Sequence, residues 1–305
     1  MSEESGKEVL RDEEGVEEVL MKYREAGKIV AEVREQAVTM VKEGVLLLEV
    51  AEFVESAIRE KGAEPAFPCN ISLNEVAAHS TPAHDDKRVF GNDVVKLDIG
   101  AHIDGYIADT AVTVDLSDEN GRLVEASEAA LRAAIEIIHE GVSTTEVGAA
   151  IERVIREYGF RPIVNLSGHG LARYVAHAPP TIPNVGQRSG VTLKENDVVA
   201  IEPFATNGAG KVSEGSIVEI YSLVKAKPVR LPAARKLLEE IRKYNTLPFA
   251  KRWLPRVQLD LALRNLEAAG VIRSYPILRE AARGLISQAE HTVIVKKDGC
   301  EIITA

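Results

Sequence analysis

Cysteine is scarce in this sequence of 305 residues, which contains two, Cys69 and Cys300. Two cysteines so far apart argue against a disulfide scaffold and against the closely spaced thiolates of a structural zinc site, and they favour a reducing compartment. No apolar run approaches the ~20 residues that a membrane helix needs. The acidic start MSEESGKEVLRDEEG lacks the features of a secretory signal peptide, so we expect a cytoplasmic protein.

Basic residues are also fewer than acidic residues. The chain carries 37 Lys and Arg against 47 Asp and Glu, which gives a formal net charge of −10. A balance of this sign disfavours nucleic acid as the main partner of the chain as a whole. Hydrophobic residues make up 45% of the sequence and charged residues 28%, as in an ordinary globular protein with one large domain or two smaller ones.

Apolar residues recur at helical spacing in four stretches of the first half of the chain. They predict helices at about 16–42, 47–61, 125–139 and 145–158. Thr144 or Thr145 should cap the last of these helices, and Gly159 lies just beyond its end.

The secondary-structure pattern of the sequence changes twice in the second half of the chain. Strand and loop patterns give way near Leu231 to a helical, basic stretch that continues to about Arg283, and a strand pair ends the chain. This order predicts an α+β fold with a main domain of residues 1–230 and 289–305, interrupted by an inserted helical subdomain at 231–288.

The stretch KLDIGAHIDGYIADTAVTV, residues 96–114, has the pattern of a buried β-hairpin. Asp104-Gly105 is a strong two-residue turn signal. Side chains alternate between the two faces of a strand, so this turn places Asp98 and Asp109 on one face as diagonal neighbours, roughly 7–8 Å apart at the backbone. The other face is almost entirely apolar and should contact the core.

Two carboxylates on one face of an apolar hairpin need an explanation. Like charges repel, and burying a charge without a partner costs several kcal/mol. A bound cation would relieve both penalties. A solvated face, on which the aspartates meet only water, explains the hairpin equally well, so the hairpin alone leaves both interpretations open.

Three later stretches contain further candidate ligands. SGHGLARYVAHAPP contains His169 and His177, while VVAIEPF and SQAEHTVIV place Glu202 and Glu290 in apolar strands. A single histidine is more often structural, and a single buried glutamate can pair with an arginine. Four carboxylates in apolar strands, together with histidines, favour a site for two cations such as Mn, Fe(II), Co or a catalytic Zn pair.

These motifs together resemble those of one family. The chain resembles methionine aminopeptidases of the type 2 class, in the archaeal form, through five motifs in family order: NEVAAHSTP, KLDIGAHIDGYIADTAVTV, NLSGHGLARYVAH, AIEPFATNGAGKV and QAEHT. The resemblance implies the pita-bread (creatinase/aminopeptidase-like) fold, in which two αβ halves enclose a dinuclear metal site. It also implies that residues 231–288 are the winged-helix-like insert typical of type 2 enzymes.

The resemblance assigns a role to each site residue. It implies two metal ions held by Asp98, Asp109, His169, Glu202 and Glu290, with Asp109 and Glu290 bridging them. His79 would contact the substrate near the scissile bond, and His177 would donate a hydrogen bond to the substrate carbonyl or the tetrahedral intermediate. The methionine side chain would occupy an apolar pocket formed by Phe67, Ala176, Phe204 and Tyr275.

The implied activity is a hydrolysis. A metallo-hydrolase of this family removes the initiator methionine from nascent proteins and peptides, prefers small second residues, and attacks the first peptide carbonyl with a metal-bridging hydroxide. Glu202 would transfer the proton from this nucleophile to the leaving amine. The ions would be Co, Mn, Fe(II) or Zn, and the family implies a monomeric protein.

Two alternatives remain beside this interpretation. A proline-specific aminopeptidase or dipeptidase of the same fold uses a very similar ligand set, although such enzymes usually carry a sizeable N-terminal domain. A non-catalytic relative that binds nucleic acid or the ribosome is the other alternative, because residues 231–288 contain 11 Lys and Arg against 5 Asp and Glu. The presence of all five ligand positions argues against a purely non-catalytic protein.

Overall fold

The structure, a computed structural model, describes the backbone of residues 3–305 and the side chains of residues 15–305. Its α-helices are α1 (Glu3–Met40), α2 (Leu47–Glu60), α3 (Gly121–Ile137), α4 (Thr144–Glu157), α5 (Pro232–Ile241) and α6 (Leu259–Ala268). The four helices predicted in the first half of the chain are all present, and α1 begins earlier than expected. None of the helices in the described part combines the length and the apolar character needed to cross a membrane.

The strands form three sheets. The large sheet has nine strands, of which seven follow the order β1-β4-β5-β15-β9-β7-β8, while β2 pairs with β4 and β16 with β15. Its members are β1 (Glu64–Pro65), β2 (Asn70–Leu73), β4 (Val94–Ile103), β5 (Tyr106–Asp115), β7 (Ser167–Ala172), β8 (Val175–Pro183), β9 (Val198–Ile201), β15 (Glu290–Lys296) and β16 (Gly299–Ile302).

Two smaller sheets lie beside the large one. A three-stranded sheet joins β14 (Ile286–Gln288), β10 (Phe204–Thr206) and β6 (Arg161–Pro162). A four-stranded sheet joins β12 (Pro248–Ala250), β11 (Val212–Leu223), β13 (Ile272–Glu280) and β3 (Val76–Ala78).

The hairpin at residues 96–114 has the predicted register. Ile103 faces Tyr106, and the pairing continues outward to Gly100–Asp109 and Asp98–Ala111. Asp104 and Gly105 both have positive φ, 51° and 88°, as expected for the two central residues of a tight β-hairpin turn. The apolar face lies in the core, and the second face is enclosed as well, because Asp109 is only 5% exposed. The interpretation of a solvated aspartate face is therefore wrong for Asp109.

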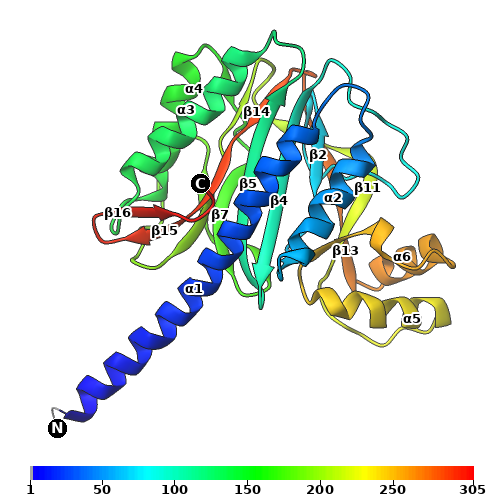
Figure 1. Cartoon of the computed structure of the whole chain (residues 1–305), viewed down its shortest axis with the longest axis horizontal. Coiled ribbons are helices and arrows are strands. Elements are labelled where there is room, and N and C mark those ends of the chain that lie inside the picture. Colours follow the sequence, from blue (N-terminus) through cyan, green and yellow to red (C-terminus); the bar gives the residue numbers. More distant parts are fainter. Residues whose placement is uncertain (1–2) are drawn as a thin grey trace.

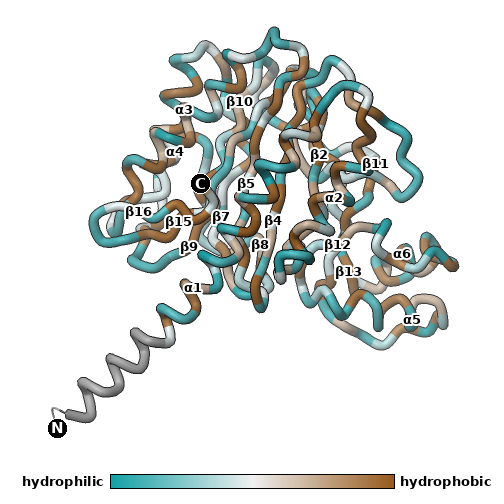
Figure 2. Tube along the Cα trace, viewed as in Figure 1, coloured by the Kyte–Doolittle hydropathy of each residue, from teal (hydrophilic) through white to brown (hydrophobic). Residues whose placement is uncertain are grey.

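Two helix pairs cover the large sheet. α1 packs on β4 and β5, and α2 packs on α1, β1 and β2, through one core cluster, which includes Val30, Val54 and Ile99. α3 and α4 pack on the strands of the other half through a second cluster, which includes Ile151 and Val293. Figure 1 shows α1 in blue across the hairpin strands and α3 and α4 in green on the other half. In Figure 2, hydrophobic and hydrophilic residues alternate along α3 and α4, as expected of helices with one buried face.

The helix α4 begins one residue earlier than predicted. Ser143, rather than Thr144 or Thr145, is the N-cap residue: its hydroxyl accepts from Thr145 N at 3.4 Å, and Glu146 Oε2 accepts from Ser143 N at 3.0 Å. This reciprocal pair is a capping box. Gly159 follows the helix with φ of 84°, as expected of a residue just past a helix end.

The basic stretch from 231 onward is helical only in part. α5 and α6 form the expected helical portion and pack together around Leu238, Phe249 and Leu263 (Figure 1). Residues 272–280, however, form β13, which pairs with β11 and β3, and residues 286–288 form β14, which pairs with β10. The prediction that the helical stretch continues to about Arg283 is therefore wrong, because residues 272–280 pair with strands that are distant in the sequence.

Candidate metal centre

Three of the predicted ligands lie on one face of the large sheet, on adjacent strands. Asp98 on β4 faces Ala111 on β5, and Ala111 faces Glu290 on β15. Asp109 precedes Ala111 by two residues and so points to the same side of the sheet. The register therefore places the three carboxylates on one surface.

The other two ligands extend this surface across two further strands. His291 on β15 faces Ile201 on β9, so Glu290 and Glu202, one residue along from each partner, point to the same side. Ala200 faces His169 on β7, and side chains two residues apart share a face, which adds His169 to the group. The strand β15, from near the end of the chain, lies between β5 and β9 in the sheet, and this position brings the two halves of the ligand set together.

The side chains come close enough to share an ion. A carboxylate oxygen from each of Asp109 and Glu290 and a ring nitrogen of His169 all lie within 4.8 Å of one another. His169 Nε2 is 3.5 Å from Glu202 Oε1 and 3.9 Å from Asp109 Oδ2. His169 Nδ1 is 3.2 Å from the carbonyl oxygen of Gly170, which can only accept. Nδ1 therefore carries the proton, and the lone pair of Nε2 points to the carboxylates.

The electrostatics of the group fit a divalent cation. Burial and the neighbouring carboxylates raise the pKa of Asp109, Glu202 and Glu290 well above their usual range. Burial also raises the pKa of Asp98, to about 7. One carboxylate oxygen of each of Asp98, Asp109 and Glu290 is buried without a hydrogen-bond partner. Oxygen donors with one imidazole are the ligands that catalytic divalent ions take in proteins, so these residues could hold such an ion.

The carboxylates line a cavity of about 370 Å³, and both predicted substrate histidines lie in its wall. His79 has a left-handed backbone with φ of 61°, and its Nδ1 donates to the carbonyl oxygen of Pro276 at 3.2 Å. The ring of His177 stacks edge-on against that of His169, with 4.7 Å between centroids. His177 is accessible through the cavity, but the protein around it lowers the pKa of its imidazole to about 3, mainly by burial, so it is neutral at physiological pH.

Three of the four predicted apolar pocket residues also line the cavity: Phe67, Phe204 and Tyr275. The ring of Phe67 lies over Gly100, where a Cβ would come within 2.3 Å of the ring, so this approach requires glycine. Ala176 does not line this cavity. It precedes His177 on β8, is buried in the core, and lines a smaller adjoining cavity instead. The cavity thus joins a charged floor to an apolar wall.

The sequence analysis missed several residues around this cavity. Gln288 is 1% exposed, and its Nε2 lies 3.5 Å from Asp98 Oδ2 and 3.4 Å from Glu290 Oε2. Gln288 begins the QAEHT motif, so its place in that motif was the available signal. Asn70 and Arg273 also line the cavity, and neither stands out in its local sequence.

Comparison with known proteins agrees with this geometry. A family model described as metallopeptidase family M24 matches residues 21–231. A methionine aminopeptidase from Archaeoglobus fulgidus is 56% identical over 290 residues, which are 94% of this chain and 99% of that protein. A methionine aminopeptidase from Methanocaldococcus jannaschii is 52% identical over 294 residues, which are 95% of this chain and 99% of that protein.

Solved structures share the fold at lower identity. A thermophilic Arx1 has a TM-score of 0.83 at 18% identity and covers 94% of this chain and 90% of its own. A methionine aminopeptidase from Thermotoga maritima has a TM-score of 0.70 at 24% identity and covers 93% of this chain and 95% of its own. A prolidase from Pyrococcus furiosus has a TM-score of 0.63 at 20% identity and covers 94% of this chain but 64% of its own. With the family match and the two relatives above 50% identity, this chain belongs to metallopeptidase family M24 and, within it, to the methionine aminopeptidases.

Proposed function

We propose that this chain is a methionyl aminopeptidase that hydrolyses the peptide bond after an N-terminal methionine. The observation that carries the proposal is the cavity itself, in which Phe67, Phe204 and Tyr275 form an apolar wall next to the group of four carboxylates and His169. An unbranched apolar side chain suits the wall, while the substrate's terminal amine and first carbonyl reach the charged floor. Nascent chains and methionyl peptides with small second residues are the proposed substrates.

The proposed cofactor is a pair of divalent ions, Co, Mn, Fe(II) or Zn. Asp98, Asp109, His169, Glu202 and Glu290 would hold them. Bound divalent ions supply Lewis acidity, which lowers the pKa of water and polarises a carbonyl oxygen. The partnerless buried oxygens of three of these carboxylates support the proposal.

The protein side chains would move protons and orient the substrate. Glu202 would accept a proton from the attacking water and deliver it to the leaving amine, since its Oε1 lies on the cavity floor, 3.5 Å from His169 Nε2. His177 is neutral and can donate an N–H to the oxyanion without adding a charge that would repel the cations. His79 donates through Nδ1 to Pro276, so its Nε2 is left to contact the substrate.

A comparison of two peptide classes tests this function. The metal-loaded chain is expected to release methionine from Met-Ala-Ser and to leave Ala-Pro peptides essentially uncut, as followed by chromatography of the products. The prolidase that shares the fold is only 64% covered by this chain, so it contains additional protein that this sequence does not match. Faster hydrolysis of the Ala-Pro bond would replace our proposal with the proline-specific alternative.

A ribosome contact, a cytoplasmic location and a monomeric state are further parts of the proposal. Residues 231–288 contain 11 Lys and Arg against 5 Asp and Glu, although the whole chain has a net charge of −10. Exposed basic side chains of this segment, such as Arg235, Lys236 and Arg256, would contact ribosomal RNA while a nascent chain is processed. We expect the chain to co-sediment with ribosomes at low salt and to dissociate as the salt concentration rises. If the chain does not pellet with ribosomes at low salt, the proposed ribosome contact is wrong.

A further inference from the structure

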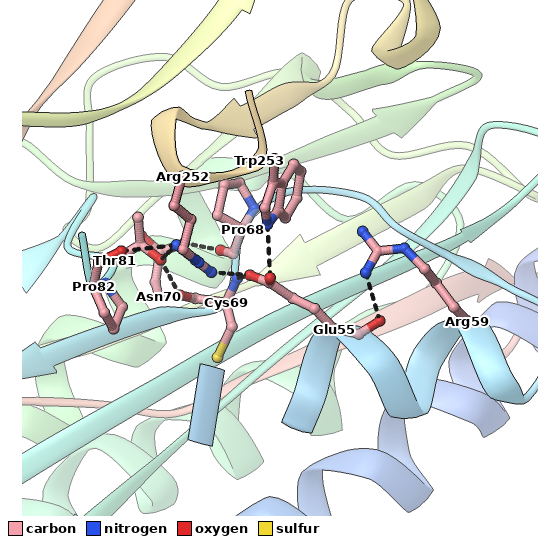
Figure 3. Close-up of polar contacts among 9 residues, drawn as sticks. All are labelled: Glu55, Arg59, Pro68, Cys69, Asn70, Thr81, Pro82, Arg252 and Trp253. Atoms are coloured by element: carbon pink, nitrogen blue, oxygen red, sulfur yellow. Dashed lines mark hydrogen bonds and ion pairs between the residues drawn. The ribbon is translucent and has the colours of Figure 1, made fainter. Parts of the chain in front are cut away.

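A second buried polar cluster lies behind one wall of the cavity and outside the metal centre. It joins Glu55 of α2 to Arg252 and Trp253, which follow β12 (Figure 3). The side chains of Glu55 and Arg252 are 5% and 3% exposed, and Arg252 Nη2 forms an ion pair with Glu55 Oε1. Trp253 Nε1 donates to Glu55 Oε2 at 2.7 Å. We call these three residues the clasp.

The clasp binds two segments that carry cavity residues. Glu55 Oε1 accepts from Cys69 N at 3.1 Å, between Phe67 and Asn70 in the chain. Arg252 Nη1 donates to Thr81 Oγ1 at 2.7 Å and to Pro82 O at 3.0 Å.

The two segments are also tied to each other. The hydroxyl of Thr81 donates to the carbonyl oxygen of Cys69 at 2.7 Å, so both polar backbone groups of Cys69 are held. His79, two residues before Thr81, has the left-handed backbone already described and depends on this loop for its position. The clasp thus lies directly behind the segments that present Phe67, Asn70 and His79 to the cavity.

The clasp also links the helical portion at 232–268 to the cavity. Arg252 and Trp253 lie between α5 and α6, and Pro248, four residues before Arg252, lines the cavity. Trp253 packs near Tyr244 of the same portion, with 5.5 Å between ring centroids, and the guanidinium of Arg59 from α2 lies 5.6 Å from the Trp253 ring. Side chains of α2 and of this helical portion therefore hold one wall together.

We propose that Glu55, Arg252 and Trp253 are positioning residues that set the wall of the cavity and thereby the selectivity for the first side chain of the substrate. The proposal rests on the proposed aminopeptidase function. No atom of the clasp is among the cavity-lining groups, so it acts through Phe67, Asn70 and His79. Its loss should loosen the apolar wall while leaving the carboxylates of the metal centre in place.

The test uses Glu55→Gln and Arg252→Met in the full chain, assayed with Met-Ala-Ser and with the same peptide carrying norleucine or leucine first. Each variant is expected to lower kcat/KM for the methionyl peptide by about 10–100-fold, mainly through KM, as small misplacements of binding groups do. The preference for methionine over leucine should fall in parallel. The Mn²⁺ dissociation constant should stay within about twofold of wild type, because the clasp does not touch the ligands.

Matched variants separate positioning from general damage. Lys251→Met removes a cation from the same short turn, but Lys251 pairs with Asp260 of α6, at 2.7 Å, so kinetics should stay like those of wild type. Trp253→Phe keeps an aromatic ring and removes the hydrogen bond to Glu55, so a smaller change in the same direction is expected. If Glu55→Gln fails to fold, Trp253→Phe carries the test.

Trp253 is the single tryptophan of the chain, so in Glu55→Gln and Arg252→Met the quenching of its fluorescence by acrylamide reports whether the clasp has opened. Trp253→Phe has no tryptophan and is judged by its KM, its selectivity and its Mn²⁺ dissociation constant. An opened clasp with wild-type KM and unchanged selectivity would overturn the proposal. A fall in kcat alone, or loss of Mn²⁺ affinity together with KM, would also overturn it and indicate a structural role. Failure of the wild-type chain to cut methionyl peptides would instead overturn the proposed function.

Discussion

Glu202→Ala is expected to lower kcat for Met-Ala-Ser by about 10²–10⁴-fold, the range that a lost general acid–base group costs. Glu202 follows β9 and points onto the same sheet face as Asp109 and Glu290, and its Oε1 lies 3.5 Å from His169 Nε2. Its removal takes away both a ligand oxygen and the group proposed to carry the proton. The measurement is steady-state release of methionine at saturating Mn²⁺.

Two controls make this result specific. Glu202→Gln keeps the shape of the side chain but cannot accept the proton as a carboxylate does, so it should be almost as inactive. Glu195→Ala changes an exposed glutamate in the loop that leads to β9 and should leave kcat unchanged. A kcat like that of wild type in Glu202→Ala, with bound metal verified, would contradict the assignment of Glu202.

The second large effect concerns stability. Four carboxylates share one enclosed surface, and burial or mutual repulsion raises the pKa of each. Without a cation these charges destabilise the folded chain. Asp98→Asn is therefore expected to stabilise the metal-free protein by about 1–4 kcal/mol, as replacement of costly buried charges does elsewhere, while it removes most of the activity. Each kcal/mol corresponds to roughly 1.5 °C in Tm for a chain of 305 residues, because the entropy of unfolding is about 2.1 cal/mol/K per residue.

Metal should stabilise the wild-type protein much more than Asp98→Asn. Mn²⁺ at 100 times its dissociation constant should stabilise the wild-type fold by about 2.7 kcal/mol, and Asp98→Asn should lose most of this gain. Thermal unfolding with and without a chelator measures both effects. Asp104→Asn is a matched control on the same hairpin, since Asp104 is exposed at the turn and should shift stability by no more than about 0.5 kcal/mol. A lower Tm for metal-free Asp98→Asn would contradict the prediction.

The raised pKa of Asp98 also determines whether the stability of the metal-free protein rises or falls with pH. The pKa is about 7 in the folded chain against an ordinary value of 3.8, so between these values the folded state holds the proton more strongly than the unfolded state. The metal-free protein should therefore lose stability as the pH rises from about 4 to about 7, and Asp98→Asn should flatten that part of the profile.

The hairpin shows what local sequence can predict. Asp104-Gly105 determines the turn, and strand alternation then places Asp98 and Asp109 on one face, because the side-chain period of a strand is two. Both statements hold in the structure. The degree of enclosure was not predictable from the hairpin, because whether a second face is wet depends on strands and loops from elsewhere in the chain.

The segment at 272–280 shows the limit of the same reasoning. Its neighbours in sequence are helical, and its own residues carry no clear alternation, yet it is a strand because β11 and β3 pair with it. Glu55 shows the same limit for a single residue. On an amphipathic helix it resembles any solvated glutamate, and only the approach of Arg252, 197 positions later in the chain, gives it a buried partner.

The sequence by itself determined the α+β character, the hairpin register and the candidate ligands, because these depend on periodicity, turn chemistry and charges placed in apolar strands. The tertiary structure alone decided that β15 lies between β5 and β9, that Ala176 does not line the main cavity, and that the clasp supports the cavity wall. The physical reason is the range of the interactions involved. Periodicity and turns act over a few residues, whereas strand order and buried ion pairs depend on contacts between segments that are far apart in the chain.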